Sequence, residues 1–364
     1  MLFRDYSGNM YAYDYSSCIE TKTWSTDSNS PQYSCFAESN DGSVYYTKLE
    51  QSTSKYKIYN YNFTTNNEEI KFTIAKNTGF FDGCYDSTTD IYWVIRNANG
   101  NLYLYKKNAE GTSEEEYNIG IAQSSFGDCA IRGENLYYSF GDDSIGYATL
   151  DYTTKSATEK TTKSLDDFGV SSGEITDMAV LEDGRVAIIV RDTSTSSTND
   201  NTTKTVIYNY TVTDGGTVYS RGALVLLSSD LSLIKTLGWT DDSSVRTISA
   251  TGSSSGYSTT WTSITAYIPE YEERNSHFYG PMRIVAVRPK ELVIADCGAN
   301  FVLPDYSGKK NGKMFTHNRL MTVNLRNFAI SCKKEFSESE IKFQNLDISG
   351  SLTVVSNWSD GVEK

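Results

Sequence analysis

The sequence has 364 residues and a formal net charge of -13, with 46 acidic and 33 basic side chains. This acidic balance argues against nucleic acid as a partner, because phosphate backbones carry the same sign of charge. The sequence contains no apolar run of about 18 residues, so we expect no membrane span within the chain. Tyrosine, serine and threonine are abundant and only five prolines occur, a composition that favours β-sheet with polar turns.

A short pattern recurs along the chain with a spacing of about 45 residues, which is the period of β-propeller blades. Each copy reads as a short strand, a polar turn and a second apolar strand. A further pair of strands follows each copy, so every repeat is expected to form a four-stranded antiparallel blade. The four clearest copies begin at Cys35, Cys84, Cys129 and Met178.

The repeats predict an all-β fold in which the whole chain, 1–364, forms one six-bladed β-propeller. In chain order, five blades are expected at residues 34–75, 81–120, 126–165, 174–240 and 282–337. The tail, 343–357, supplies half a blade and the head, 1–25, supplies the other half. We therefore expect strand 352–356 to lie in the same sheet as strand 10–15. Joining both termini in one blade closes the ring and removes an exposed sheet edge.

The fifth repeat carries the most regular motif, IVAVRPKELVIADCGAN from Ile284 to Asn300. It resembles a repeat of the NHL type of six-bladed propeller, in which an apolar-Ala-Val strand and a turn precede a Val-Ala-Asp strand. The tyrosine-rich repeats are also similar to those of bacterial surface or periplasmic propellers, many of which are lipoproteins. This resemblance implies a location outside the cytoplasm, with a leader absent from this sequence. A cytoplasmic location stays open, because Met1 leads straight into strand-like sequence.

The sequence contains no nucleophile elbow, zinc-protease motif, phosphate-binding glycine loop or Cys-x-x-Cys pair, so an enzyme is not the first expectation. Cys35, Cys84 and Cys129 occupy equivalent positions on three predicted innermost strands. A small buried residue explains these positions most simply. A metal site is the alternative.

Three aspartates, Asp82, Asp128 and Asp177, each stand one or two residues before the residue that begins a repeat. This spacing places three carboxylates near one mouth of the central channel. Carboxylate oxygens from several blades suit a hard cation such as calcium. The other interpretation is that these aspartates are solvated residues at the beginnings of strands.

Three insertions interrupt the repeats, at 192–221, 241–281 and 298–317. Connections between the second and third strands of a blade leave the same end of the sheets as the links between blades. All three insertions are therefore expected on one face, and insertions into repeats often build a binding surface. We expect a depression there, lined by some of Trp261, Tyr267, Tyr271, His277, Tyr279, Tyr306 and His317.

The sequence thus favours an extracytoplasmic binding or scaffolding module that recognises a glycan, a peptide or a partner protein. Aromatic rings with polar tips on the insertion face suit such ligands. One alternative is a propeller hydrolase or lactonase that uses a cation at the channel mouth. A second alternative is a purely architectural protein of the cell envelope. Beyond a calcium ion in the channel, no cofactor is expected.

Overall fold

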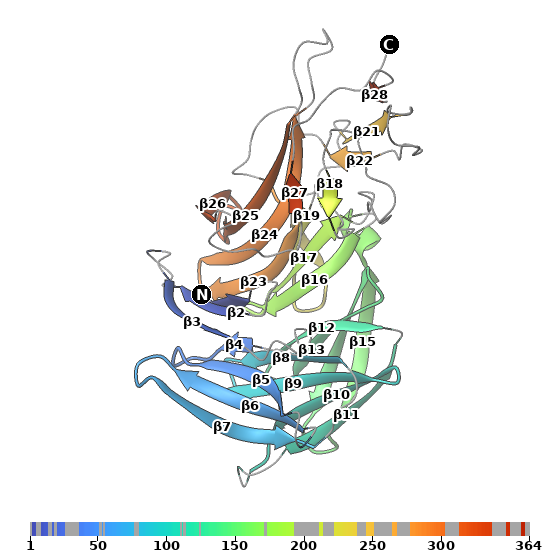
Figure 1. Ribbon diagram of the computed structural model, residues 1–364. Coiled ribbons are helices and arrows are strands. Elements are labelled where there is room, and N and C mark those ends of the chain that lie inside the picture. The colour runs from blue at the N-terminus through green and yellow to red at the C-terminus, as the bar shows by residue number, and fades with distance from the viewer. Residues whose placement is uncertain are drawn as a thin grey trace.

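The computed structural model describes residues 2–4, 9–13, 17, 20–25, 36–50, 53, 55–75, 80–109, 111, 114–123, 125–170, 173–192, 211–213, 222–238, 245–250, 264–267, 277–302, 313–336, 347–349 and 358–360. Within these residues, five four-stranded antiparallel sheets follow one another along the chain (Figure 1). Within each sheet, the strands are arranged in the same order in which they occur along the chain. The architecture confirms an all-β propeller built from four-stranded antiparallel blades.

The five blades contain the following strands. The first has β4 (Phe36–Glu38), β5 (Val44–Glu50), β6 (Lys55–Asn62) and β7 (Asn67–Ile74). The second has β8 (Phe80–Asp86), β9 (Ile91–Ala98), β10 (Asn101–Lys107) and β11 (Glu114–Ala122). The third has β12 (Phe126–Arg132), β13 (Asn135–Phe140), β14 (Ser144–Asp151) and β15 (Ser156–Ser164), and the 3-10 helix η2 (Leu165–Phe168) follows it. The fourth has β16 (Gly173–Val180), β17 (Val186–Asp192), β19 (Gly222–Leu227) and β20 (Leu233–Leu237). The fifth has β23 (Pro281–Arg288), β24 (Glu291–Val302), β25 (Lys313–Asn324) and β26 (Ile330–Glu335).

The head of the chain forms a three-stranded antiparallel sheet of β1 (Leu2–Arg4), β2 (Asn9–Tyr13) and β3 (Glu20–Ser25). In the tail, β27 (Asp347–Ser349) pairs with β18 (Thr211–Thr213). The last strand, β28 (Trp358–Asp360), pairs with β21 (Val245–Ala250), whose other neighbour is β22 (Ile264–Tyr267). The strand expected at 352–356 lies outside the described residues, so closure of the ring by the tail stays a prediction.

The hairpin β24–β25 is longer than the rest of its blade. Its pairing continues from Glu291 opposite Asn324 as far as Val302 opposite Lys313. However, β23 pairs with β24 only as far as Asp296, and β26 pairs with β25 only from Arg319 onward. The remaining residues form a two-stranded ribbon that extends beyond the blade, toward the end where β18, β21, β22, β27 and β28 lie (Figure 1). The insertion expected at 298–317 therefore begins and ends as a continuation of two blade strands.

Apolar clusters fill the spaces between neighbouring blades. Neighbouring residues of one strand face opposite sides of its sheet, so the second, third and fourth blades each contribute to two clusters. In β13, Tyr138 packs in the cluster shared with the second blade, while Tyr137 packs in the cluster shared with the fourth. In β17, Ile188 and Ile189 divide in the same way between the third and fifth blades. Each fully buried side chain of this kind contributes about 1.5–3 kcal/mol to stability.

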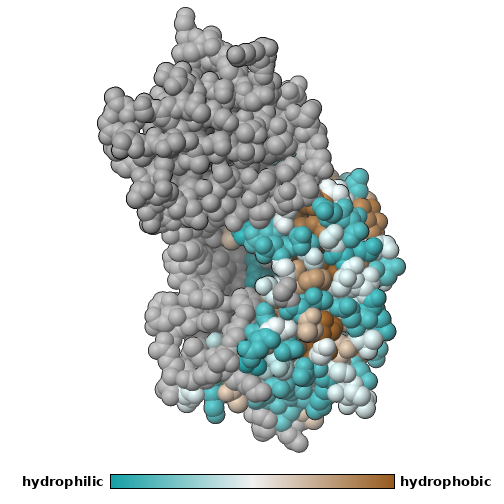
Figure 2. All heavy atoms as spheres, turned by 90° about the vertical axis from the view of Figure 1, so that its right-hand side faces the viewer, coloured by the Kyte–Doolittle hydropathy of each residue, from teal (hydrophilic) through white to brown (hydrophobic). Residues whose placement is uncertain are grey.

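The surface of the described residues is mainly polar. Their large exposed apolar side chains are Ile70, Leu233 and Ile234, which lie on outermost strands. Figure 2 shows hydrophilic atoms over most of the coloured face, with apolar atoms in small, separate patches. No helix in the described part of the chain is long and apolar enough to cross a membrane.

Candidate functional site in the central channel

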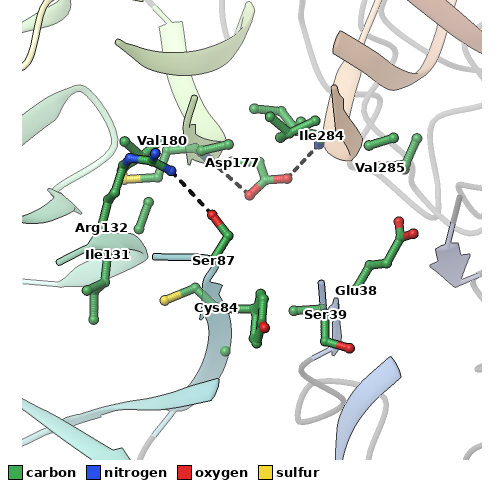
Figure 3. Close-up of a pocket in the computed structure, with 18 of the residues that line it drawn as sticks. Glu38, Ser39, Cys84, Ser87, Ile131, Arg132, Asp177, Val180, Ile284 and Val285 are labelled. Atoms are coloured by element: carbon green, nitrogen blue, oxygen red, sulfur yellow. Dashed lines mark hydrogen bonds between the residues drawn. The ribbon is translucent and has the colours of Figure 1, made fainter. Parts of the chain in front are cut away.

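A cavity of about 460 Å³ lies at one mouth of the central channel. Its walls come from the innermost strands β4, β8, β12, β16 and β23 of the five described blades. Figure 3 shows Arg132 and Ile131 on one side, Glu38 and Ser39 on the opposite side, and Cys84 and Ser87 between them. Cavities of this size are typical of small-molecule sites.

The cavity opens at the end of the blades where the innermost strands finish, because Asn40, Ser87 and Glu182 in the turns after β4, β8 and β16 line it. The first insertion leaves from the other end, since Gly173 at the start of β16 pairs with Asp192. The β24–β25 ribbon also leaves from that end, beyond the pair Pro281–Asp296 at the start of β23. The cavity therefore lies at the end of the blades opposite to the one from which these two insertions leave.

At the inner end of the cavity, the three predicted aspartates converge on one arginine. The nearest nitrogen–oxygen distances from Arg283 are 3.1 Å to Asp177, 3.6 Å to Asp82 and 3.9 Å to Asp128. The three carboxylates are buried, whereas 43% of the Arg283 side chain is exposed. A guanidinium thus lies among the carboxylates where the sequence suggested calcium. Among the described residues, no group of three or more His, Cys, Asp or Glu side chains is arranged to hold a metal ion.

Two of these aspartates also join neighbouring blades. Asp128 of β12 accepts a hydrogen bond of 2.7 Å from the backbone N–H of Met178 in β16. Asp177 of β16 accepts one of 2.6 Å from the backbone N–H of Ile284 in β23 (Figure 3). The strand register shifts at both aspartates, which indicates β-bulges. One shift falls between Phe126 and Cys129, and the other falls between Ile175 and Asp177. Bulges redirect side chains, and here they accompany carboxylates that reach across to the next blade.

The aspartates of this cluster have opposite pKa shifts. Burial raises the pKa of Asp128 well above its ordinary value, and the charges of Asp82 and Asp177 raise it further. Burial also raises the pKa of Asp82, but Arg283 and the hydrogen bonds from Asp128 and Gly83 outweigh it and lower the pKa overall. Asp128 is therefore the member of the cluster that takes up a proton most readily, and its side chain hydrogen-bonds to both Asp82 and Asp177. Sharing a proton reduces the repulsion between neighbouring carboxylates.

Two further arginines line the described walls of the cavity. Arg132 donates to the backbone carbonyl of Glu182 at 2.7 Å and to the hydroxyl of Ser87 at 3.3 Å. Arg288 forms an ion pair of 3.1 Å with Glu38, which joins the fifth blade to the first. These contacts hold the rim of the cavity together across the blades.

Two cysteines also belong to the cavity wall. Cys84 and Cys129 are free thiols. Burial is the main cause that raises the pKa of each thiol well above its ordinary value, so both are held in the neutral form. Cys35 lies outside the described residues.

The aromatic ligand residues expected from the sequence are only partly described. Tyr279 is fully buried, its backbone N–H donates to Asp296 at 3.0 Å, and the Arg319 guanidinium lies 4.6 Å from its ring centre. This interior position differs from the expected place in a surface depression. His277 is half-buried, and its carbonyl accepts a hydrogen bond from Arg319. Only the backbone of Tyr267 in β22 and of His317 in β25 is described, and Trp261, Tyr271 and Tyr306 lie outside the described residues.

The sequence pattern did not predict the cavity residues Arg283, Arg132, Arg288 and Glu38. A signal exists for Arg283, because it stands directly before an apolar run of the fifth repeat, as Asp128 and Asp177 stand in theirs. A basic residue at the position that is acidic in the other repeats indicates an ion-pair partner for those aspartates. The other three residues have no repeated equivalent, and only the arrangement of the blades brings them together.

Comparisons with known proteins found one family match and several structures that are similar to this chain. Residues 236–345 match the family described as the TdpA C-terminal domain. A protein of unknown function from Bacteroides caccae is 9% identical, with a TM-score of 0.51 over 94% of each chain. Regucalcin from Agrobacterium tumefaciens, a calcium-binding protein, is 10% identical, with a TM-score of 0.45 over 93% of this chain and 87% of that one. TolB from Acinetobacter baumannii is 10% identical, with a TM-score of 0.46 over 92% of this chain and 63% of that one. No curated protein matches the sequence.

Proposed function

We propose that this protein is a binding module that holds a small polar ligand of the glycan class in the cavity of its central channel. The observation that carries the proposal is the cavity of about 460 Å³, walled by five blades and supplied with paired donors and acceptors. Its carboxylate, amide and guanidinium groups include Glu38, Asn40 and Arg132. Sugars present neighbouring hydroxyls, and planar polar groups make paired hydrogen bonds with such hydroxyls.

The recessed shape of the site favours a small ligand over a flat protein surface. In the described part of the chain, large exposed apolar side chains are few and lie on outermost strands. Stable protein interfaces usually have an apolar centre. A cation-dependent hydrolase is less well supported, because Arg283 already neutralises part of the charge of the three aspartates.

The proposal includes a ring of six blades, in which the sheet β1–β3 belongs to the sixth. In its support, β1 contacts β23, so the head of the chain lies beside the fifth blade. The NHL-like motif at Ile284–Asn300 and the expected extracytoplasmic location belong to the same proposal. Removing the first 24 residues is then expected to expose an edge and cause aggregation, whereas a soluble truncation would contradict a six-bladed ring.

A ligand screen by thermal shift tests the binding function. We would measure the melting of the full chain with a panel of oligosaccharides and a panel of short peptides. A ligand at 100 times its Kd stabilises the folded state by about 2.7 kcal/mol. Glycan-induced stabilisation is expected to be reduced in Glu38→Ala and Asn40→Ala.

The matched control is Arg326→Ala, which changes an exposed residue in the turn between β25 and β26. It is expected to keep the stabilisation by glycans. Stabilisation by peptides alone would contradict the glycan class. Equal stabilisation of the two cavity variants and the wild type would contradict the location of the site.

A further inference from the structure

The arginines in the cavity walls differ in how their charges are balanced. Arg283 lies among three carboxylates, and Arg288 is paired with Glu38. Arg132 donates only to neutral oxygens in its two hydrogen bonds, the Glu182 carbonyl and the Ser87 hydroxyl. Across the described chain, no carboxylate lies within ion-pair distance of its guanidinium. A cavity-lining positive charge without a protein counter-ion favours an anionic group on the ligand.

Arg132 is also held in place for such a role. Its side chain is half-buried, and its bond of 2.7 Å to Glu182 joins it to the neighbouring fourth blade. The second bond, of 3.3 Å to Ser87 of the second blade, is longer and weaker (Figure 3). A guanidinium has more N–H donors than these two acceptors occupy, and its planar fork matches a carboxylate in two parallel hydrogen bonds.

The wall opposite Arg132 has a different character. Glu38 lies there, where Arg288 neutralises its charge. Asn40 also lines the cavity and donates to the carbonyl of Ser87 at 2.9 Å. These groups suit hydroxyls better than a second charge. The chain as a whole carries a net charge of -13, so general attraction does not draw anions to it. Binding of an anion here requires a local cation.

From these contacts we propose that the ligand is an acidic sugar and that Arg132 binds its carboxylate, while its hydroxyls face Glu38 and Asn40. This inference rests on the proposed function, because it names the kind of glycan that the cavity holds. A hydrogen bond to a charged group contributes about 1.5–3 kcal/mol, and 1.4 kcal/mol corresponds to a tenfold change in affinity.

Calorimetry with matched sugars tests this inference. The probes are oligogalacturonate against oligogalactose, and oligomers of glucuronate against those of glucose, with sulfated oligogalactose as a third anion. We expect the wild type to bind the carboxylated member at least about tenfold more tightly than the neutral member. This preference is expected to weaken as NaCl rises, because salt screens the charge.

Three variants make the test specific. Arg132→Gln is expected to abolish the preference, so that the carboxylated sugar binds no more tightly than the neutral sugar does to the same variant. Arg132→Lys keeps the charge but not the fork, so it is expected to retain only part of the preference, and it serves if Arg132→Gln fails to fold. Arg326→Gln is the control on an exposed turn, and it is expected to keep the full preference.

The outcomes separate the two proposals. Equal binding of acidic and neutral sugars overturns the inference and leaves the proposed function intact. A preference that survives in both Arg132 variants overturns the role of this residue. Equal affinity for the sulfated and carboxylated sugars overturns the carboxylate as the recognised group. If no sugar binds the wild type, the proposed function fails and this inference fails with it.

Discussion

Two arginine–aspartate sites in this protein have the same chemistry but different surroundings. In the fifth blade, Arg319 and Asp296 pair at 2.7 Å with side-chain exposures of 1% and 0%. Asp296 also accepts hydrogen bonds from the backbone N–H groups of Tyr279 and Gly280. In the channel, Arg283 is 43% exposed and lies among three aspartates from three other blades. We call the first the closed pair and the second the open cluster.

The difference shows which site supports structure alone and which also faces the ligand cavity. The closed pair balances one charge against one and belongs entirely to the fifth blade. The open cluster has more acidic than basic groups, contacts the cavity and links several blades. The open cluster, with unequal charges beside solvent, is the site where we expect added ions and the raised pKa of Asp128 to change stability.

Breaking the closed pair is expected to have the largest effect on stability. Arg319→Met leaves the Asp296 carboxylate buried without its cation, which costs about 3–5 kcal/mol. Urea denaturation of the variant and the wild type measures this difference. The double variant Arg319→Met with Asp296→Ala is expected to recover part of the loss. A loss below about 1 kcal/mol, as for an exposed pair, would show that the site is not closed.

Breaking the open cluster is expected to cost less and to create a dependence on calcium. Arg283→Met removes the guanidinium from three neighbouring carboxylates, at a cost of about 1–3 kcal/mol. Carboxylate oxygens are the ligands that calcium prefers, so millimolar CaCl₂ is expected to restore the melting temperature of this variant. The wild type and Arg319→Met serve as controls and are expected to show no calcium effect. Absence of rescue would mean that the carboxylates are too far apart to share an ion.

The raised pKa of Asp128 makes the stability contributed by the open cluster depend on pH. Its folded pKa is raised, mainly by burial, so its contribution to stability is complete below the unfolded pKa of about 3.9. That contribution is lost as pH rises from there through the folded pKa. Asp128→Asn keeps an acceptor for Met178 but cannot ionise, so it is expected to match the wild type near pH 4 and to exceed it near pH 8.

The measurement for Asp128 is the free energy of unfolding from urea titrations across this pH range. Asp142→Asn, in the exposed turn between β13 and β14, is the control, and its profile is expected to follow that of the wild type. Parallel profiles for Asp128→Asn and the wild type would mean that Asp128 is ionised in the folded protein.

The smallest effect is expected at the rim of the cavity. Arg288 and Glu38 form a partly exposed pair, with side-chain exposures of 34% and 31%. Exposed pairs contribute about 0–1 kcal/mol, so Arg288→Ala is expected to change the unfolding free energy by no more than that. A larger loss in chemical denaturation would indicate that this contact is needed to join the first and fifth blades.

The blades could be predicted because the evidence for them is local. A repeat of about 45 residues with four apolar strands is enough to indicate a propeller blade. Alternation within strands explains why Tyr137 and Tyr138 are both buried, since each faces a different neighbouring blade. Equivalent positions in the repeats also brought Asp82, Asp128 and Asp177 to one place in the prediction. The identity of their central partner was not predicted, because Arg283 breaks the repeat.

The sequence by itself determined the class of fold and the convergence of three aspartates. The reason is that residues at the same position of each repeat occupy the same position in each blade around the channel. Only the tertiary structure decided that a guanidinium lies among these carboxylates. It also decided that a cavity opens at the end of the blades away from the first insertion and the β24–β25 ribbon, and that Arg132 faces Glu38 across it. The physical reason is that these contacts join side chains from different blades. Their geometry depends on bulges and on the packing of whole sheets, which no single repeat encodes.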